Sequence, residues 1–243
     1  MIRRTLFFAG TMMLGLAVVG CAAKGPSIEE LTAQVETYKW PDPTRFDEAF
    51  EKFDAEGEQP TGAIVAIGSS SMRGWHKMMG EDLAPLTIIP RGFGGSTMYD
   101  ALHFVDRGVI DLKPRAVMLY EGDNDVTWGL PAEAVIDAFR AFKARIHAAD
   151  PKVRIHVFSI KPSPARMDRW PEMMRANELL RLECEADKRL FLIDVSTPLL
   201  DEDGQPLEEL FVGDRVHMNR AGYERWRDAV RAAVLPIEEK YEK

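Results

Sequence analysis

Four polar segments of this 243-residue chain carry the side chains that acyl transfer at a serine requires. That chemistry needs a hydroxyl held clear of the backbone, a base, a group that orients the base, and donors for the oxyanion. Each segment alone has an ordinary explanation as a helix cap or a turn. Together they supply serine, histidine, aspartate, a glycine N–H and an asparagine amide. The segments are GSSS at 68–71, RGFGGS at 91–96, EGDND at 121–125 and GDRVH at 213–217.

Short apolar runs precede three of these segments and predict the strands that position them. Helical patterns lie between the runs, such as the apolar face that begins after Pro131. Strands that alternate with helices are typical of an α/β fold, in which helices cover both faces of a parallel sheet. Such sheets carry their functional sites at the carboxyl ends of the strands. The predicted strands cover residues 63–67, 86–89, 116–120, 153–160 and 190–195.

The motifs resemble those of the SGNH hydrolases, also called the GDSL esterase/lipase family. The family's serine, glycine, Gly-x-Asn-Asp and Asp-x-x-His blocks occur in order over about residues 62–235. GSSSMRGW at 68–75 resembles a subfamily in which Gly-Ser-Ser-Ser replaces Gly-Asp-Ser, and RGFGGS, YEGDND and IKPSPAR are similar to that subfamily too. The resemblance implies a three-layer α/β/α fold with a flavodoxin-like five-stranded parallel sheet. It also implies a carboxylic ester hydrolase that needs no cofactor.

The nucleophile is assigned by this resemblance. Ser70 matches it because Ser70 is third in the block that starts at Gly68. Ser71 remains the alternative. Ser69 stands where most of the family has aspartate, so the local hydrogen bonds of this block are expected to differ.

The remaining site residues are also implied by the resemblance. His217 matches the base, a residue type that titrates near neutral pH, and Asp214, three positions earlier, matches the group that orients it. The oxyanion hole is expected from Gly95, Asn124 and the backbone N–H of Ser70. Glycine lets a backbone N–H approach the substrate, and asparagine offers a donor without a charge.

The N-terminus has the pattern of an export signal. Arg3 and Arg4 precede an uncharged, mostly apolar stretch over 5–20, which is shorter than the ~20 residues of a membrane-crossing helix. VVGC at 18–21 then resembles a bacterial lipobox, which implies cleavage before Cys21 and acylation of that cysteine. We therefore expect a lipid anchor in the bacterial cell envelope. Alanine after the cysteine favours the outer membrane, on its periplasmic face.

These observations divide the chain into three parts. We expect a lipoprotein signal peptide at 1–20, a tether with a lead-in helix at 21–43, and the hydrolase domain at 44–243. A capping box at 27–30 predicts the lead-in helix, and Pro41-Asp42-Pro43 is expected to end it.

Composition excludes several other classes of function. The net charge is −8, and −10 without residues 1–20, because that segment holds two arginines; duplex nucleic acid is therefore not expected as a partner. The five histidines show no metal-ligand spacing, and neither a P-loop nor a dinucleotide fingerprint is present. A flavin at the strand ends would leave His217, Asp214 and Asn124 without roles. Cys184 is interpreted as a packed cysteine.

The substrate is open within the family. Small-molecule or lipid esters are expected, and short acyl or acetyl groups are favoured because no long apolar insertion is visible. A lysophospholipase or a thioesterase is the alternative, and an inactive binding or structural lipoprotein on the same fold is the alternative of another class. The sequence does not fix the oligomeric state.

Other residues near the strand ends allow two interpretations. The loop at 161–170 either meets a polar or anionic part of the substrate or is simply solvated. Arg91 either contacts substrate or pairs with a carboxylate, whereas Asp125 is expected to hold the turn that presents Asn124. Two roles are also open for Trp75, Met78 and Met79: they either line an acyl pocket or pack their helix against the core.

Overall fold

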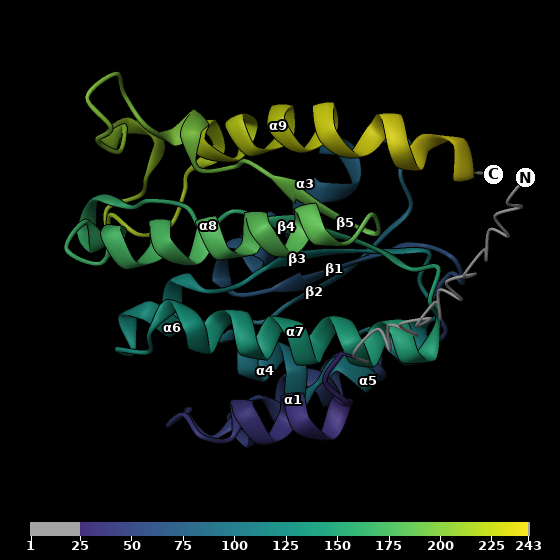
Figure 1. Ribbon diagram of the computed structural model, residues 1–243. Coiled ribbons are helices and arrows are strands. Elements are labelled where there is room, and N and C mark those ends of the chain that lie inside the picture. The colour runs from purple at the N-terminus through teal and green to yellow at the C-terminus, as the bar shows by residue number, and fades with distance from the viewer. Residues whose placement is uncertain (1–24, 243) are drawn as a thin grey trace, which may run out of the picture.

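The computed structural model describes residues 25–242, which form a five-stranded parallel sheet between two layers of helices (Figure 1). The strand order is β2-β1-β3-β4-β5, the flavodoxin-like order of doubly wound α/β sheets. The predicted fold class is therefore confirmed. The strands are β1 (Ile64–Gly68), β2 (Ile88–Gly92), β3 (Ala116–Tyr120), β4 (Arg154–Phe158) and β5 (Leu190–Ile193).

The helices divide between the two faces of the sheet. The longer helices are α3 (Ser70–Asp82), α7 (Ala132–Ala149), α8 (Trp170–Ala186) and α9 (Arg220–Glu238). The shorter ones are α1 (Ile28–Val35), α2 (Asp47–Asp54), α4 (Met98–His103), α5 (Val105–Gly108) and α6 (Asp123–Thr127). In Figure 1, α3 and α9 lie on one face, and α1, α4, α5 and α7 lie on the other. Helix α8 packs beside α7 and against β5.

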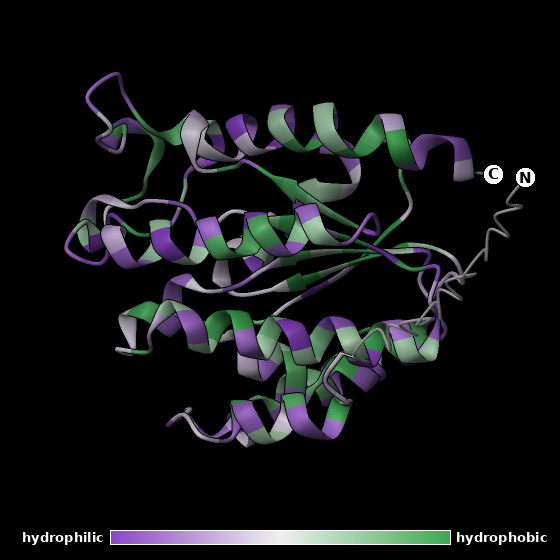
Figure 2. Ribbon diagram, in the orientation of Figure 1, coloured by the Kyte–Doolittle hydropathy of each residue, from purple (hydrophilic) through white to green (hydrophobic). Residues whose placement is uncertain are grey.

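Alternation along the strands fills two cores, one on each face. In β1, Val65 packs in the core that holds Phe139 of α7, and its neighbour Ile64 packs in the core that holds Trp226 of α9. All of them are fully buried, and burying such a side chain stabilises the fold by about 1.5–3 kcal/mol. Figure 2 shows the result as apolar strands between helices that turn polar residues outward.

Strand β2 differs from its predicted position by two to three residues. It was expected at 86–89 and lies at Ile88–Gly92, where Pro90, Arg91 and Gly92 continue the pairing with β1. A proline lacks the N–H for a ladder bond and is tolerated at a sheet edge, and β2 is the edge strand. The polar end of this strand therefore has no apolar signature in the sequence.

The first described helix packs on the folded body. Ser27 and Glu30 form the expected capping box, with Ser27 N–H donating to Glu30 Oε2 at 2.7 Å. Val35 is fully buried against the core that includes α7. Pro26 lines a hollow of about 350 Å³ with His147 near the end of α7 and Arg189 just before β5. The chain therefore enters the domain at the edge of the sheet where the strands begin.

The expected signal peptide and the lipidation residue Cys21 lie outside the described residues. Among the helices within 25–242, none combines the length and apolar content of a membrane span.

Candidate active site

Ser70 stands at the junction of β1 and α3, where a parallel sheet presents side chains at its carboxyl edge. Gly68 ends the strand with φ +152° and lies so close to β3 that a Cβ there would collide with the carbonyl oxygen of Tyr120. Ser70 then begins α3 and is partly exposed, whereas Ser69 and Ser71 are 0% and 1% exposed. Of the three hydroxyl groups, the one on Ser70 is accessible to a substrate.

Ser70, His217 and Asp214 form one continuous hydrogen-bonded chain. His217 Nε2 lies 2.8 Å from Ser70 Oγ, and His217 Nδ1 lies 2.6 Å from Asp214 Oδ2. Because the carboxylate accepts the proton on Nδ1, it favours the tautomer whose Nε2 can accept the serine proton. The order matches that of a nucleophile, its base and the group that orients the base.

Asp214 is held by the turn that also carries His217. Its Oδ1 accepts hydrogen bonds from the backbone N–H groups of Val216 and His217, both at 2.9 Å. Arg215 adopts φ +59° inside this turn, a left-handed conformation that non-glycine residues rarely adopt. The His217 side chain and these backbone donors lower the pKa of Asp214, so it is ionised at neutral pH. The side chains of His217 and Asp214 are 42% and 48% exposed, so the site is open to solvent.

Asn124 and Gly95 meet at the same edge of the sheet. Asn124, in α6 after β3, donates from Nδ2 to the carbonyl oxygen of Ser96 at 2.9 Å. Gly95 has φ +89°, which explains the need for glycine there, and a Cβ at this position would meet no atom within 4 Å. Because β2, β1 and β3 are adjacent, the segments that follow them lie beside one another. Asn124 and Gly95 therefore lie at the same rim of the sheet as Ser70.

Two buried acids support this rim. Glu121 accepts the hydroxyl proton of Ser96 at 2.5 Å, and Asp125 accepts the backbone N–H of Met98 at 2.8 Å. Burial raises the pKa of Glu121 well above its usual value and that of Asp125 to about 7. Asp125 thus joins the Asn124 turn to the start of α4, a longer-range contact than the local turn expected from the sequence.

The chain matches a known family over most of this fold. A model of the GDSL-like lipase/acylhydrolase family matches residues 55–225, which is more than half of the chain. The chain belongs to this family. As a GDSL-like acylhydrolase, it is a hydrolase that acts on ester bonds. No curated protein matches the chain.

Solved structures with this fold include several acylhydrolases. A GDSL-like lipase from Bacteroides thetaiotaomicron VPI-5482 has a TM-score of 0.67 at 20% identity, covering 83% of this chain and 98% of that one. A member of the lipolytic protein G-D-S-L family from Veillonella parvula DSM 2008 has a TM-score of 0.61 at 19% identity, with 73% and 100% covered. A carbohydrate esterase family 3 structure from Talaromyces cellulolyticus has a TM-score of 0.58 at 17% identity, with 74% and 99% covered.

The loop after β4 contacts both the Asn124 segment and the His217 segment of the candidate site, and the sequence left its role open. Lys161 is 1% exposed and donates from Nζ to the carbonyl oxygen of Val216 at 2.9 Å. The N–H of Ala165 donates to the carbonyl oxygen of Arg215 at 3.1 Å. Arg166 reaches Asn124. The available sequence signal was the position of IKPSPAR after a strand, and it did not reveal these partners.

Other candidates have structural roles. Arg91 is buried and pairs with Glu56 at 2.8 Å, which is the carboxylate alternative. Trp75 is fully buried against Tyr223 and Trp226, so it packs α3 on α9. Met79 is also buried, and Met78 packs against the same core. Burial raises the pKa of the Cys184 thiol to about 12, which makes it a poor nucleophile at neutral pH.

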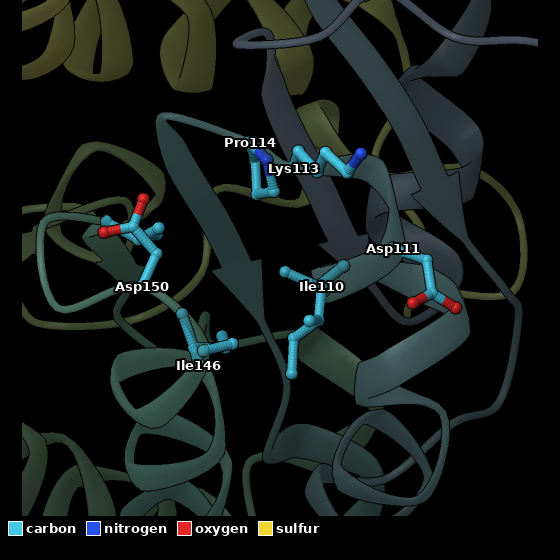
Figure 3. A pocket seen from close by; sticks show the side chains of 9 residues that line it. Ile110, Asp111, Lys113, Pro114, Ile146 and Asp150 are labelled. Atoms are coloured by element: carbon cyan, nitrogen blue, oxygen red, sulfur yellow. The ribbon is translucent and has the colours of Figure 1, made fainter.

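A cavity elsewhere in the protein does not coincide with the candidate site. A cavity of about 500 Å³ lies between Ile110, Lys113 and Pro114 on one side and Ile146 and Asp150 on the other. Figure 3 shows the side chains that line it. These residues lie where the strands begin, at the edge opposite Ser70, and none of the site residues lines it. Within residues 25–242, no group of three or more His, Cys, Asp or Glu side chains is arranged to hold a metal ion.

Proposed function

We propose that this acylhydrolase is a serine esterase with Ser70 as nucleophile, His217 as base and Asp214 as the group that orients the base. The observation that carries the proposal is the unbroken chain of 2.8 Å and 2.6 Å contacts from the hydroxyl to the carboxylate. A serine hydroxyl is a weak nucleophile unless a base removes its proton during attack. Here the base lies within hydrogen-bond distance of that proton.

The reaction follows from this geometry. Ser70 Oγ attacks the acyl carbon while its proton passes to His217 Nε2, and the carbonyl oxygen becomes an oxyanion. Gly95 N–H, Asn124 Nδ2 and Ser70 N–H are the proposed donors for that charge. The intermediate expels the alcohol, which takes the proton from His217. Water then attacks the acyl-enzyme, again through His217, and releases the acid and the free serine.

An open site favours small acyl groups. The His217 and Asp214 side chains are about half exposed, so the candidate site is open to solvent around the base. We propose short-chain or acetyl esters as substrates. The fold shared with a carbohydrate esterase of family 3 makes acetylated sugars a reasonable first test.

A lipid anchor at Cys21 in the cell envelope is proposed on the lipobox-like sequence. Pro26 lies where the strands begin, and Ser70 lies where they end. A tether at that end would direct the site away from the membrane that holds it. This arrangement favours soluble or polymeric esters over the lipids of the anchoring leaflet.

The test is a panel of p-nitrophenyl esters from acetate to palmitate, assayed on the soluble domain. We expect the highest kcat/KM with acetate or butyrate, and a loss of at least 10⁴-fold in Ser70→Ala. Ser71→Ala, which removes the neighbouring buried hydroxyl, is the matched control and should remain active. Unchanged turnover in Ser70→Ala would refute the mechanism, and failure of a fluorophosphonate probe to label the wild type would favour an inactive scaffold.

A further inference from the structure

Arg166 lies directly behind the amide of Asn124. One guanidinium nitrogen, Nη1, is 3.2 Å from Asn124 Oδ1 and 3.2 Å from Asp123 Oδ2. The Arg166 side chain is 20% exposed and that of Asp123 is 4% exposed. The cation is thus held against the turn that carries Asn124 and is paired with a carboxylate of the same turn.

This contact selects one orientation of the Asn124 amide. The carbonyl and NH₂ ends of an asparagine side chain have nearly the same shape, but only the NH₂ end can donate to an oxyanion. Arginine carries donors and no acceptor, so Arg166 can bind only the carbonyl end. The carbonyl oxygen of Ser96 binds one N–H at 2.9 Å. Both contacts favour the same orientation, and the second N–H remains for a substrate.

The charge of Arg166 also acts on the strength of that donor. A guanidinium stays protonated in proteins, and a hydrogen bond to a carbonyl oxygen polarises the whole amide group. Electron density drawn toward Oδ1 makes the N–H of Asn124 a better donor. Asp123 Oδ2 lies 3.2 Å from Arg166 Nη1 and 3.9 Å from Lys161 Nζ, so this carboxylate holds Arg166 in place but is shared between two cations.

The loop that carries Arg166 is fixed from the other side of the site. Lys161 Nζ and Ala165 N–H bind the carbonyl oxygens of Val216 and Arg215, just before His217. The position of Arg166 is therefore set relative to the base as well as to Asn124. A side chain held at both ends in this way can maintain a fixed geometry through the reaction.

We propose that Arg166 is a positioning residue that orients and polarises the Asn124 amide for oxyanion stabilisation. The inference rests on the proposed function, since it assigns Arg166 a part in the same acyl-transfer reaction. On this proposal, Arg166 acts through Asn124 and not by binding the substrate.

The test is a double-mutant cycle with p-nitrophenyl acetate. Arg166→Met keeps the length of the side chain and removes the guanidinium, and Asn124→Ala removes the donor. Loss of one oxyanion donor costs about 10²–10³ in kcat, so we expect Asn124→Ala in that range and Arg166→Met at about 10–100-fold. Because the oxyanion exists only during the reaction, kcat should fall with KM nearly unchanged. In the Asn124→Ala background, Arg166→Met should cost less than about threefold more.

Several results would overturn the inference. These are a KM rise with kcat unchanged, losses that multiply in the double variant, or full activity in Arg166→Met. Arg169→Met removes a cation from the same loop, where Arg169 pairs with exposed Asp168, and should keep wild-type kinetics. If Arg166→Met does not fold, Arg166→Gln, which also removes the positive charge, carries the same cycle with its melting temperature as the check. Activity that is absent from the wild type, or retained by Ser70→Ala, identifies failure of the proposed function instead.

Discussion

Replacing Asp214 with asparagine tests the catalytic geometry most directly. The carboxylate uses Oδ1 for the backbone N–H groups of Val216 and His217 and Oδ2 for the imidazole Nδ1. An asparagine can keep the backbone contacts through its one oxygen. In that orientation its NH₂ group takes the place of Oδ2 and faces Nδ1 of His217. That NH₂ stabilises the tautomer with the proton on Nε2, and this tautomer cannot accept a proton from Ser70.

The magnitude depends on how much water can replace the lost contact. The same exchange in a buried triad costs about 10⁴ in kcat. Here the Asp214 and His217 side chains are 48% and 42% exposed, so solvent can in part orient the imidazole. We therefore expect a loss of about 10²–10³ in kcat, equivalent to about 3–4 kcal/mol in the activation free energy.

The assay is kcat and KM for p-nitrophenyl acetate at neutral pH, with the melting temperature measured for each variant. Asp203→Asn, at an exposed position in the loop before η5 (Glu208–Leu210), makes the same chemical change away from the site and should be neutral. A kcat for Asp214→Asn within threefold of wild type would refute the tautomer argument. A large drop in melting temperature would show that the residue acts through the stability of its turn.

Three further predictions concern stability and anchoring. Gly68→Ala should lower the melting temperature by several degrees, because its Cβ meets the Tyr120 carbonyl oxygen at φ +152°; Gly80→Ala, with open space around its Cβ in α3, should raise it slightly. The pKa of Asp125 is raised to about 7 in the folded state, so the folded state binds more protons than the unfolded state between about pH 4 and 7. The contribution of the protonated Asp125 to stability is therefore fully present below about pH 4 and is lost as pH rises toward 7. Asp125→Asn should flatten this part of the melting-temperature profile, and an unchanged slope would contradict the shift. Labelled palmitate should be incorporated in a lipoprotein-processing host and lost in Cys21→Ala; an unlabelled wild type counts against the anchor.

The sequence could predict the elements whose signal is local and apolar. Strand β3 lies where it was expected, at Ala116–Tyr120, because every residue of it is buried in an apolar run. The predicted position of strand β2 was wrong by two to three residues because the end of the strand, Pro90 to Gly92, pairs through backbone atoms and has no hydrophobic pattern. Its bounds depend on the neighbouring strand, which is information that a single segment does not contain.

The site shows the same division. Ser70, Asn124 and His217 carry recognisable motifs, and the structure places Ser70 and His217 in contact. The partners of the supporting residues were not predictable, because Arg166 and Asn124 are 42 positions apart and meet only when the sheet forms. Glu121 is another example, since it is buried and its carboxyl group accepts a hydrogen bond from the Ser96 hydroxyl. An acid before a turn normally reads as a solvated residue.

His217 and Asp214 share one short turn. His217 is 147 positions from Ser70 along the chain. The proposed base and the carboxylate that orients it therefore keep their mutual geometry through local contacts, whereas their position relative to the Ser70 hydroxyl depends on the fold. Substitutions at the two ends of this segment can therefore change the distance between His217 and Ser70 while the contact between His217 and Asp214 stays the same.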